Sequence, residues 1–138
     1  MVLVIALPDL AKRVCAVVPD AIGYVLSVDS PSDLRHRVYK YQPDIVLLDS
    51  RMGGSSWMAI DEVPAIVGRT ESHPYVIMLL PWTTQEVERE AVKRQCYDVI
   101  SVASEDFESD VWAAVQTARK ARCARDVPRR AVRRRNYH

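Results

Sequence analysis

The sequence lacks most of the features that assign a chain to a class at first sight. Its 138 residues contain only three cysteines and three histidines, with no C-x-x-C pair and no spacing typical of a zinc site. Cys15, Cys96 and Cys123 are odd in number and far apart, which favours reduced thiols in a cytosolic chain. No apolar run is long enough to span a membrane, and Met1–Leu7 lacks the basic start of a signal peptide. We therefore expect a cytoplasmic protein with no membrane segment, no metal and no cofactor.

What the chain does contain is an ordinary globular composition and an uneven distribution of charge. Hydrophobic residues make up 49% and charged residues 27%, and the length is close to that of one common domain. The net charge is +1, but nine of the 19 basic residues and only one of the 18 acidic residues lie from Arg119 onward. The part before Arg119 therefore carries −7 and the remainder +8. We expect one domain over residues 1–124 and a basic tail or linker over residues 125–138.

The most informative stretch is Pro43-Asp44-Ile45-Val46-Leu47-Leu48-Asp49. Its unbroken Ile/Val/Leu run predicts a strand that is buried on both faces, as in the centre of a parallel sheet. Asp49 ends this run and is followed by the polar loop Ser50–Ser56. A carboxylate at the end of such a strand lies at the carboxyl edge of the sheet, where open α/β folds bind their ligands. Asp49 is therefore the first candidate functional residue.

Similar apolar runs and helix-start signals divide the chain into five strand–helix units. Alternation of this kind requires a parallel sheet with right-handed crossovers, so we predict one doubly wound α/β domain with helices on both faces. The strands are expected at Val2–Leu7, Tyr24–Val28, Ile45–Asp49, Tyr75–Leu80 and Val99–Val102. The helices are expected over Pro8–Val18, from Ser30 to before Pro43, over Thr83–Gln95 with a Thr83–Glu86 capping box, and from Ser104 into the tail. A further helix is expected around Trp57–Ile66, short or kinked because Pro64 falls inside it.

Residues 1–124 resemble the receiver domain of bacterial two-component response regulators. The resemblance rests on the five βα units, the third-strand motif that ends in Asp49, Met52 three residues later, and the fourth strand Tyr75-Val76-Ile77-Met78-Leu79. Cys96-Tyr97-Asp98 before the last strand is also similar. The resemblance implies a flavodoxin-like (CheY-like) five-stranded parallel sheet in the order 2-1-3-4-5. It also implies that Asp49 matches the aspartate that receives a phosphoryl group from a histidine kinase.

The other residues of the family's phosphorylation chemistry are missing. Phosphoryl transfer requires the developing charge to be neutralised, which the family does with a magnesium ion and with polar or cationic side chains. The family has an acidic pair after the first strand, a Ser or Thr after the fourth, and an aromatic and a lysine at the fifth. Because magnesium requires hard oxygen ligands, the resemblance implies a degenerate receiver, or pseudo-receiver, without magnesium-dependent phosphorylation of Asp49. The matching positions are occupied by Ala6 and Leu7, Leu80, Val99 and Val102.

Three functions stay open at this point. The first is an atypical, non-enzymatic signalling domain that binds a protein partner or a second copy through the face made by the fourth helix, the fifth strand and the fifth helix, as receiver domains commonly do. The charges on the fourth helix also balance one another without a partner, so their pattern alone does not select this face. The third function is a conventional phospho-acceptor receiver at Asp49. For the first function, the candidate interface residues are Glu90, Arg94 and Trp112.

The second function is a nucleic-acid-associated regulator that uses its basic tail. Arginines in this number would bind phosphate without reading sequence. The resemblance also allows the tail to be a linker to an absent DNA-binding effector domain, and the first of its cations would suit the negative end of a helix dipole without any partner. The residues proposed to contact nucleic acid are Arg129, Arg130, Arg133, Arg134 and Arg135.

Two tryptophans flank the expected position of Asp49. Trp82 follows the fourth strand, and Trp57 follows the glycine loop. They would either line a small-molecule pocket or fill the space that the family's metal site occupies. The second alternative is favoured because large aromatic side chains usually serve packing.

Overall fold

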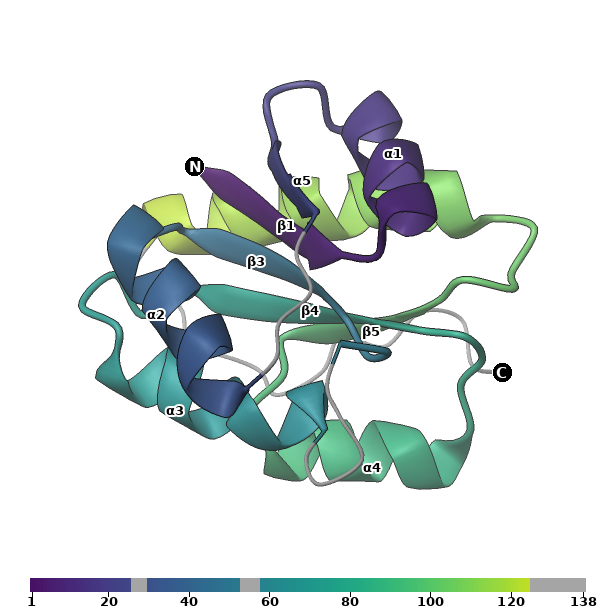
Figure 1. Cartoon of the computed structure of the whole chain (residues 1–138). Coiled ribbons are helices and arrows are strands. Elements are labelled where there is room, and N and C mark those ends of the chain that lie inside the picture. Colours follow the sequence, from purple (N-terminus) through teal and green to yellow (C-terminus); the bar gives the residue numbers. More distant parts are fainter. Residues whose placement is uncertain (26–29, 53–57, 125–138) are drawn as a thin grey trace.

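The computed structural model describes residues 1–25, 30–52 and 58–124. They form three layers, with a parallel sheet between two layers of helices (Figure 1). The five strands β1 (Val2–Ala6), β2 (Ile22–Val25), β3 (Ile45–Asp49), β4 (Tyr75–Leu80) and β5 (Asp98–Ser101) are arranged in the order β2-β1-β3-β4-β5. The helices are α1 (Pro8–Val17), α2 (Pro31–Tyr41), the 3-10 helix η1 (Ala59–Glu62), α3 (Val63–Arg69), α4 (Gln85–Lys93) and α5 (Phe107–Ala124).

The predicted alternation of strands and helices is confirmed, with β3 and β4 at the predicted residues. The other strands are displaced by one or two residues, because pairing with the neighbouring strand sets their ends. β2 begins at Ile22 rather than Tyr24, where it pairs with Leu3 of β1. The predicted remainder of that strand, residues 26–28, lies outside the described residues. β5 runs from Asp98 to Ser101, one residue earlier than predicted at each end.

Two helix starts differ from the sequence-based expectation. The N-cap of α4 is Thr84 and not Thr83, because Thr84 has the extended backbone of a cap and its side chain accepts a hydrogen bond from the amide of Val87 (3.2 Å). The predicted short helix at Pro64 is confirmed, since α3 has only seven residues. Pro64 does not kink this helix, because it lies in the first turn of α3, where its missing N–H would have no partner in any case, and η1 precedes it.

The core consists of two apolar layers, one on each face of the sheet. α1 and α5 cover one face, and α2, α3 and α4 cover the other (Figure 1). Successive strand residues alternate between them, so that Leu47 packs with α1 and α5 while Val46 and Leu48 pack on the opposite side. Burial of each such side chain contributes roughly 1.5–3 kcal/mol, which explains the continuous apolar runs of the central strands. In the described part of the chain, no helix combines the length and apolarity needed to cross a bilayer.

The last turn of α5 is anchored at the amino edge of the sheet. Arg122 donates a hydrogen bond to the carbonyl oxygen of His73 (2.7 Å) and forms an ion pair with Asp44 (3.2 Å). The same carboxylate binds the N-terminal ammonium of Met1 (2.6 Å), and this hydrogen bond lowers the pKa of Asp44. The guanidinium of Arg122 also lies over the ring of Tyr75, 5.6 Å from its centroid. These contacts fix the C-terminal end of α5 far from Asp49.

Candidate functional site

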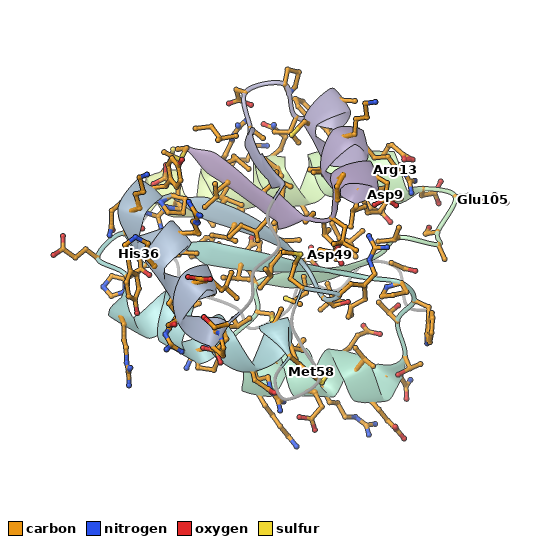
Figure 2. All side chains as sticks on the ribbon, in the orientation of Figure 1. Asp9, Arg13, His36, Asp49, Met58 and Glu105 are labelled. Atoms are coloured by element: carbon orange, nitrogen blue, oxygen red, sulfur yellow. The ribbon has the colours of Figure 1, made fainter. Side chains whose placement is uncertain are left out.

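Asp49 lies at the carboxyl end of β3, in the middle of the sheet and only 1% exposed (Figure 2). Its carboxylate accepts hydrogen bonds from two backbone amides. The amide of Leu7, which connects β1 to α1, donates to Oδ2 (3.2 Å), and the amide of Arg51 donates to Oδ1 (2.9 Å). Hydrogen bonds to the charged form of a carboxylate stabilise it in a buried position. The structure therefore confirms that Asp49 lies at the carboxyl edge of the sheet, and it shows in addition that the side chain is buried.

The guanidinium of Arg51 occupies the remaining side of this carboxylate. Its Nε lies 3.1 Å from Oδ1 and 3.2 Å from Oδ2 of Asp49, and its Nη2 donates to Oδ2 at 2.9 Å. The same Nη2 lies 3.6 Å from Oδ1 of Asp9, at the start of α1. The hydrogen bonding to Asp49 raises the pKa of the Arg51 guanidinium. Arg51 thus neutralises Asp49 with a fixed, forked cation and links it to α1.

Sequence reasoning missed Arg51. It expected Asp49 to be surrounded mainly by hydrocarbon, because the positions that match the family's polar groups are apolar. The chain instead turns directly after β3, where the amide of Met52 donates to the carbonyl oxygen of Asp49 (3.0 Å) and brings the Arg51 side chain back over the carboxylate. A cation two residues after a strand-ending aspartate was the available signal.

The residues around Asp49 do not fit the magnesium site of conventional receivers. Ala6 is fully buried, and Leu7 contributes a backbone N–H, which attracts an anion and cannot ligate a metal. Asp9 is the nearest acidic substitute, but its carboxylate faces Arg51. Within the described ranges, no group of three or more His, Cys, Asp or Glu side chains could hold a metal ion. The cation that contacts Asp49 is the guanidinium of Arg51.

The other degenerate positions take part in packing. Leu80, at the end of β4, and Val99, in β5, belong to the core beneath α2, α3 and α4. Val102 packs against the opposite core, and its amide donates to the carbonyl oxygen of Leu80 (2.7 Å). Trp82 does not plug the crevice, since its side chain is 69% exposed. Trp57 lies outside the described residues.

The two candidate interface residues on α4 are directed towards η1. Arg94 donates to Oδ1 of Asp61 in η1 (2.9 Å) and to the carboxylate of Glu90. Hydrogen bonding to Arg94 lowers the pKa of Glu90. Helical periodicity places Glu88 and Val92 on the opposite side of α4. Glu90 and Arg94 therefore lie on the side of α4 that contacts η1.

Trp112 lies on the side of α5 that faces α1. One turn before it, Glu108 forms an ion pair with Arg13 of α1 (2.9 Å), and two turns after it, Arg119 binds Asp20 just beyond α1 (2.6 Å). The structure does not bring Trp112 together with Glu90 and Arg94. An interface that uses these three residues stays a prediction.

The candidate nucleic-acid contacts Arg129, Arg130, Arg133, Arg134 and Arg135 lie outside the described residues. Two of the basic residues that precede them have structural partners. Arg119 binds Asp20, and Arg122 binds Asp44 and the carbonyl oxygen of His73. These two cations hold α5 in place and are not free to contact phosphate.

A groove of about 670 Å³ lies between α4 and η1, above the carboxyl ends of β3 and β4. Its apolar lining comes from Met58, Ile60, Leu80 and Val87, and Ser50, the neighbour of Asp49, also contributes to it. Sequence reasoning did not predict this groove, because its walls come from four segments that are distant in the chain.

Comparisons with known proteins give a consistent result for the fold. No family model and no curated protein matches the chain. Solved structures do match it, and they are consistently response-regulator receiver domains. The signal receiver domain of the putative Luxo repressor protein from Vibrio parahaemolyticus superposes with a TM-score of 0.72 at 12% identity, covering 91% of this chain and 94% of that one.

Two further receivers give the same answer. The chemotaxis response regulator CheY4 of Vibrio cholerae has a TM-score of 0.65 at 14% identity, covering 86% of this chain and 98% of that one. The receiver domain of the putative response regulator NarL from Mycobacterium tuberculosis has a TM-score of 0.66 at 17% identity, covering 86% and 95%. At these identities the likeness establishes the CheY-like receiver fold.

Proposed function

We propose that this chain is an atypical receiver domain that signals through protein–protein contacts and does not use magnesium-dependent phosphorylation of Asp49. The observation that carries the proposal is the contact between Asp49 and Arg51. Both carboxylate oxygens accept hydrogen bonds from this guanidinium and from backbone amides, which supports the proposal that Asp49 is a poor nucleophile. The positions that would ligate magnesium are occupied by Ala6 and Leu7, which offer no side-chain oxygen.

The arrangement also provides a reason for a stable, unphosphorylated state. In a conventional receiver a metal ion neutralises the charge at this site. Here Arg51 supplies a cation permanently and joins the end of β3 to the start of α1 through Asp9. A charge-assisted, forked contact of this kind is strong and geometrically specific. The protein then acts as a constitutive adaptor that binds its partner through its surface, independently of phosphorylation.

Intact-mass measurement after incubation with acetyl phosphate and magnesium tests the proposal. The native protein is expected to keep its mass, while a conventional receiver treated in the same way gains one phosphoryl group. A gain of one phosphoryl group on the native chain, absent from Asp49→Asn, would overturn the proposal. Arg51→Ala is included to determine whether removal of the guanidinium alone restores reactivity.

A second candidate function rests on the five arginines between residues 129 and 135. They support a nucleic-acid-associated regulator whose tail contacts phosphate, which predicts affinity for a random duplex that falls steeply with salt concentration. Truncation after Asp126 should abolish both the affinity and its salt dependence. Equal binding by the truncated and full-length chains would contradict this function.

A further inference from the structure

The groove between α4 and η1 exposes apolar surface that the described residues leave uncovered. Met58, at the start of η1 and beside α4 (Figure 2), is 59% exposed. Val87 of α4 is only partly buried, and Ala91 is the only fully buried side chain in this helix. α4 therefore contributes little to the core and presents one side to an open, apolar groove. Exposed apolar surface lined by polar groups is typical of a binding site.

Two groups of charges surround this groove. Asp61, Glu90, Lys93 and Arg94 neutralise one another through ion pairs of 2.9 Å (Arg94 with Asp61) and 3.6 Å (Lys93 with Glu90) and through the contact between Arg94 and Glu90. Glu86 and Arg89 form no ion pair with any residue in the described ranges. They are three residues apart on one helix, which corresponds to about 4.5 Å along its axis. A ligand with a basic and an acidic group one helical turn apart would complement them.

The surroundings of the groove restrict the conformation of such a ligand. The groove is bounded by α4, by η1 and by the end of β4, and β4 is paired on both sides with β3 and β5. Among the described residues no strand edge is open there, so an extended peptide would find no backbone partners in them. A helix satisfies its own backbone and can place apolar side chains at positions i, i+3 or i+4, and i+7 into the groove.

We propose that this groove binds an amphipathic helix of a protein partner, with an apolar stripe on the groove floor, a basic residue beside Glu86 and an acidic residue beside Arg89. The proposal rests on the proposed function, because it assigns the partner surface of the adaptor. It places the interface between α4 and η1, next to Ser50 and the Asp49 site, and not on the side of α4 near β5.

The test is a selection of random 16-residue peptides displayed against the full native chain. Selected peptides should show apolar residues at helical spacing, flanked by a basic and an acidic residue one turn apart. Met58→Glu should weaken their binding by about tenfold or more, since it places a carboxylate on the apolar floor. Because Met58 is largely exposed, this variant should fold normally, which circular dichroism and the thermal midpoint verify.

Val92→Glu is the matched control. Val92 is 43% exposed, lies on α4 and does not line the groove. Its change should leave peptide affinity within about twofold of native. Arg89→Glu should weaken the same peptides and should be rescued when their acidic residue is replaced by lysine. That rescue identifies the charge contact and separates it from general disturbance of α4.

Several outcomes would overturn the proposal. Selected peptides without helical periodicity would do so, as would binding that is equal in Met58→Glu and native protein, or binding that is lost in Val92→Glu instead. Concentration-dependent dimerisation that Met58→Glu abolishes would assign the groove to a second copy of the chain. Each of these results leaves the acetyl phosphate experiment unchanged, whereas phosphorylation of Asp49 would refute the proposed function even if the peptides bind.

Discussion

Arg51 contacts both carboxylate oxygens of Asp49 from a position only two residues further along the chain. Because the two residues are so close in sequence, forming the contact costs little loop-closure entropy. Because Arg51 also reaches Asp9, it connects the centre of the sheet with α1. The acceptor position of the receiver fold is in this way part of an internal ion pair.

Removal of Arg51 should destabilise the protein. Arg51→Ala leaves Asp49 as a buried carboxylate with two backbone donors and no cation, which should cost about 2–3 kcal/mol. This cost is below the range of about 3–5 kcal/mol for breaking a fully buried pair, because Arg51 is 40% exposed. Urea unfolding measures the change as a shift in midpoint at constant slope.

Lys93→Ala is a suitable control for this change. Lys93 is 72% exposed and lies 3.6 Å from Glu90, so its loss should change the free energy of unfolding by less than about 0.5 kcal/mol. The double variant Asp49→Asn, Arg51→Ala should recover part of the lost stability, because it leaves no buried charge. An Arg51→Ala variant as stable as Lys93→Ala would show that the guanidinium contributes little.

The N-cap of α4 provides a second test of stability. Thr84→Ala removes the side chain that accepts from the amide of Val87 and should cost about 1 kcal/mol. Thr83→Ala changes the same residue type one position earlier, where the side chain caps nothing, and should cost far less. Thermal denaturation of the two variants compares them directly, and equal losses would mean that Thr84 has no special role.

The stability should depend on Asp44 at acidic pH. The N-terminal ammonium lowers the pKa of this carboxyl below its ordinary value of 3.8, so the unfolded chain binds its proton first as pH falls. The stabilisation is therefore fully present above about pH 4 and is lost as pH falls through the lowered pKa of the folded state. Since Asp44 is half exposed, the effect is below about 1 kcal/mol. The difference in unfolding free energy between native protein and Asp44→Asn should close over this pH range.

The cysteines should differ sharply in reactivity. Burial raises the pKa of the Cys96 thiol to about 12, whereas Cys123 is exposed near the end of α5. Because the thiolate is the reactive form, iodoacetamide should modify Cys123 in native protein and Cys96 only after unfolding. Peptide mass spectrometry identifies the modified sites. Rapid labelling of Cys96 under native conditions would mean that β5 and its surroundings open readily.

The sequence was sufficient for the sheet, because apolar runs bounded by proline and aspartate are long and unambiguous in the central strands. β3 and β4 occur where the pattern predicts them. The edge strand β2 was misplaced because its sequence is less apolar and its ends depend on pairing with β1. The choice between Thr83 and Thr84 depends on one backbone conformation, which residue type alone does not determine.

The site was predicted only in part. Asp49 was identified because it ends a buried strand, but its partner depends on how a side chain folds back over a turn. Trp112 was predicted as an interface residue from its helix alone, and the ion pairs that flank it on α5 depend on helix phase, which composition does not report. The groove next to α4 depends on packing between distant segments, to which no local pattern corresponds.

The anchorage of α5 has a mechanical consequence. This helix of 18 residues is a rod about 27 Å long, and Arg122 pins it at the end opposite the crevice. Ala124, the last residue of α5, thus lies at the rim of the sheet opposite Asp49. A structural change near Asp49 would reach this end of the protein only through a tilt or shift of α5. Such a movement would have to break the ion pair between Arg122 and Asp44.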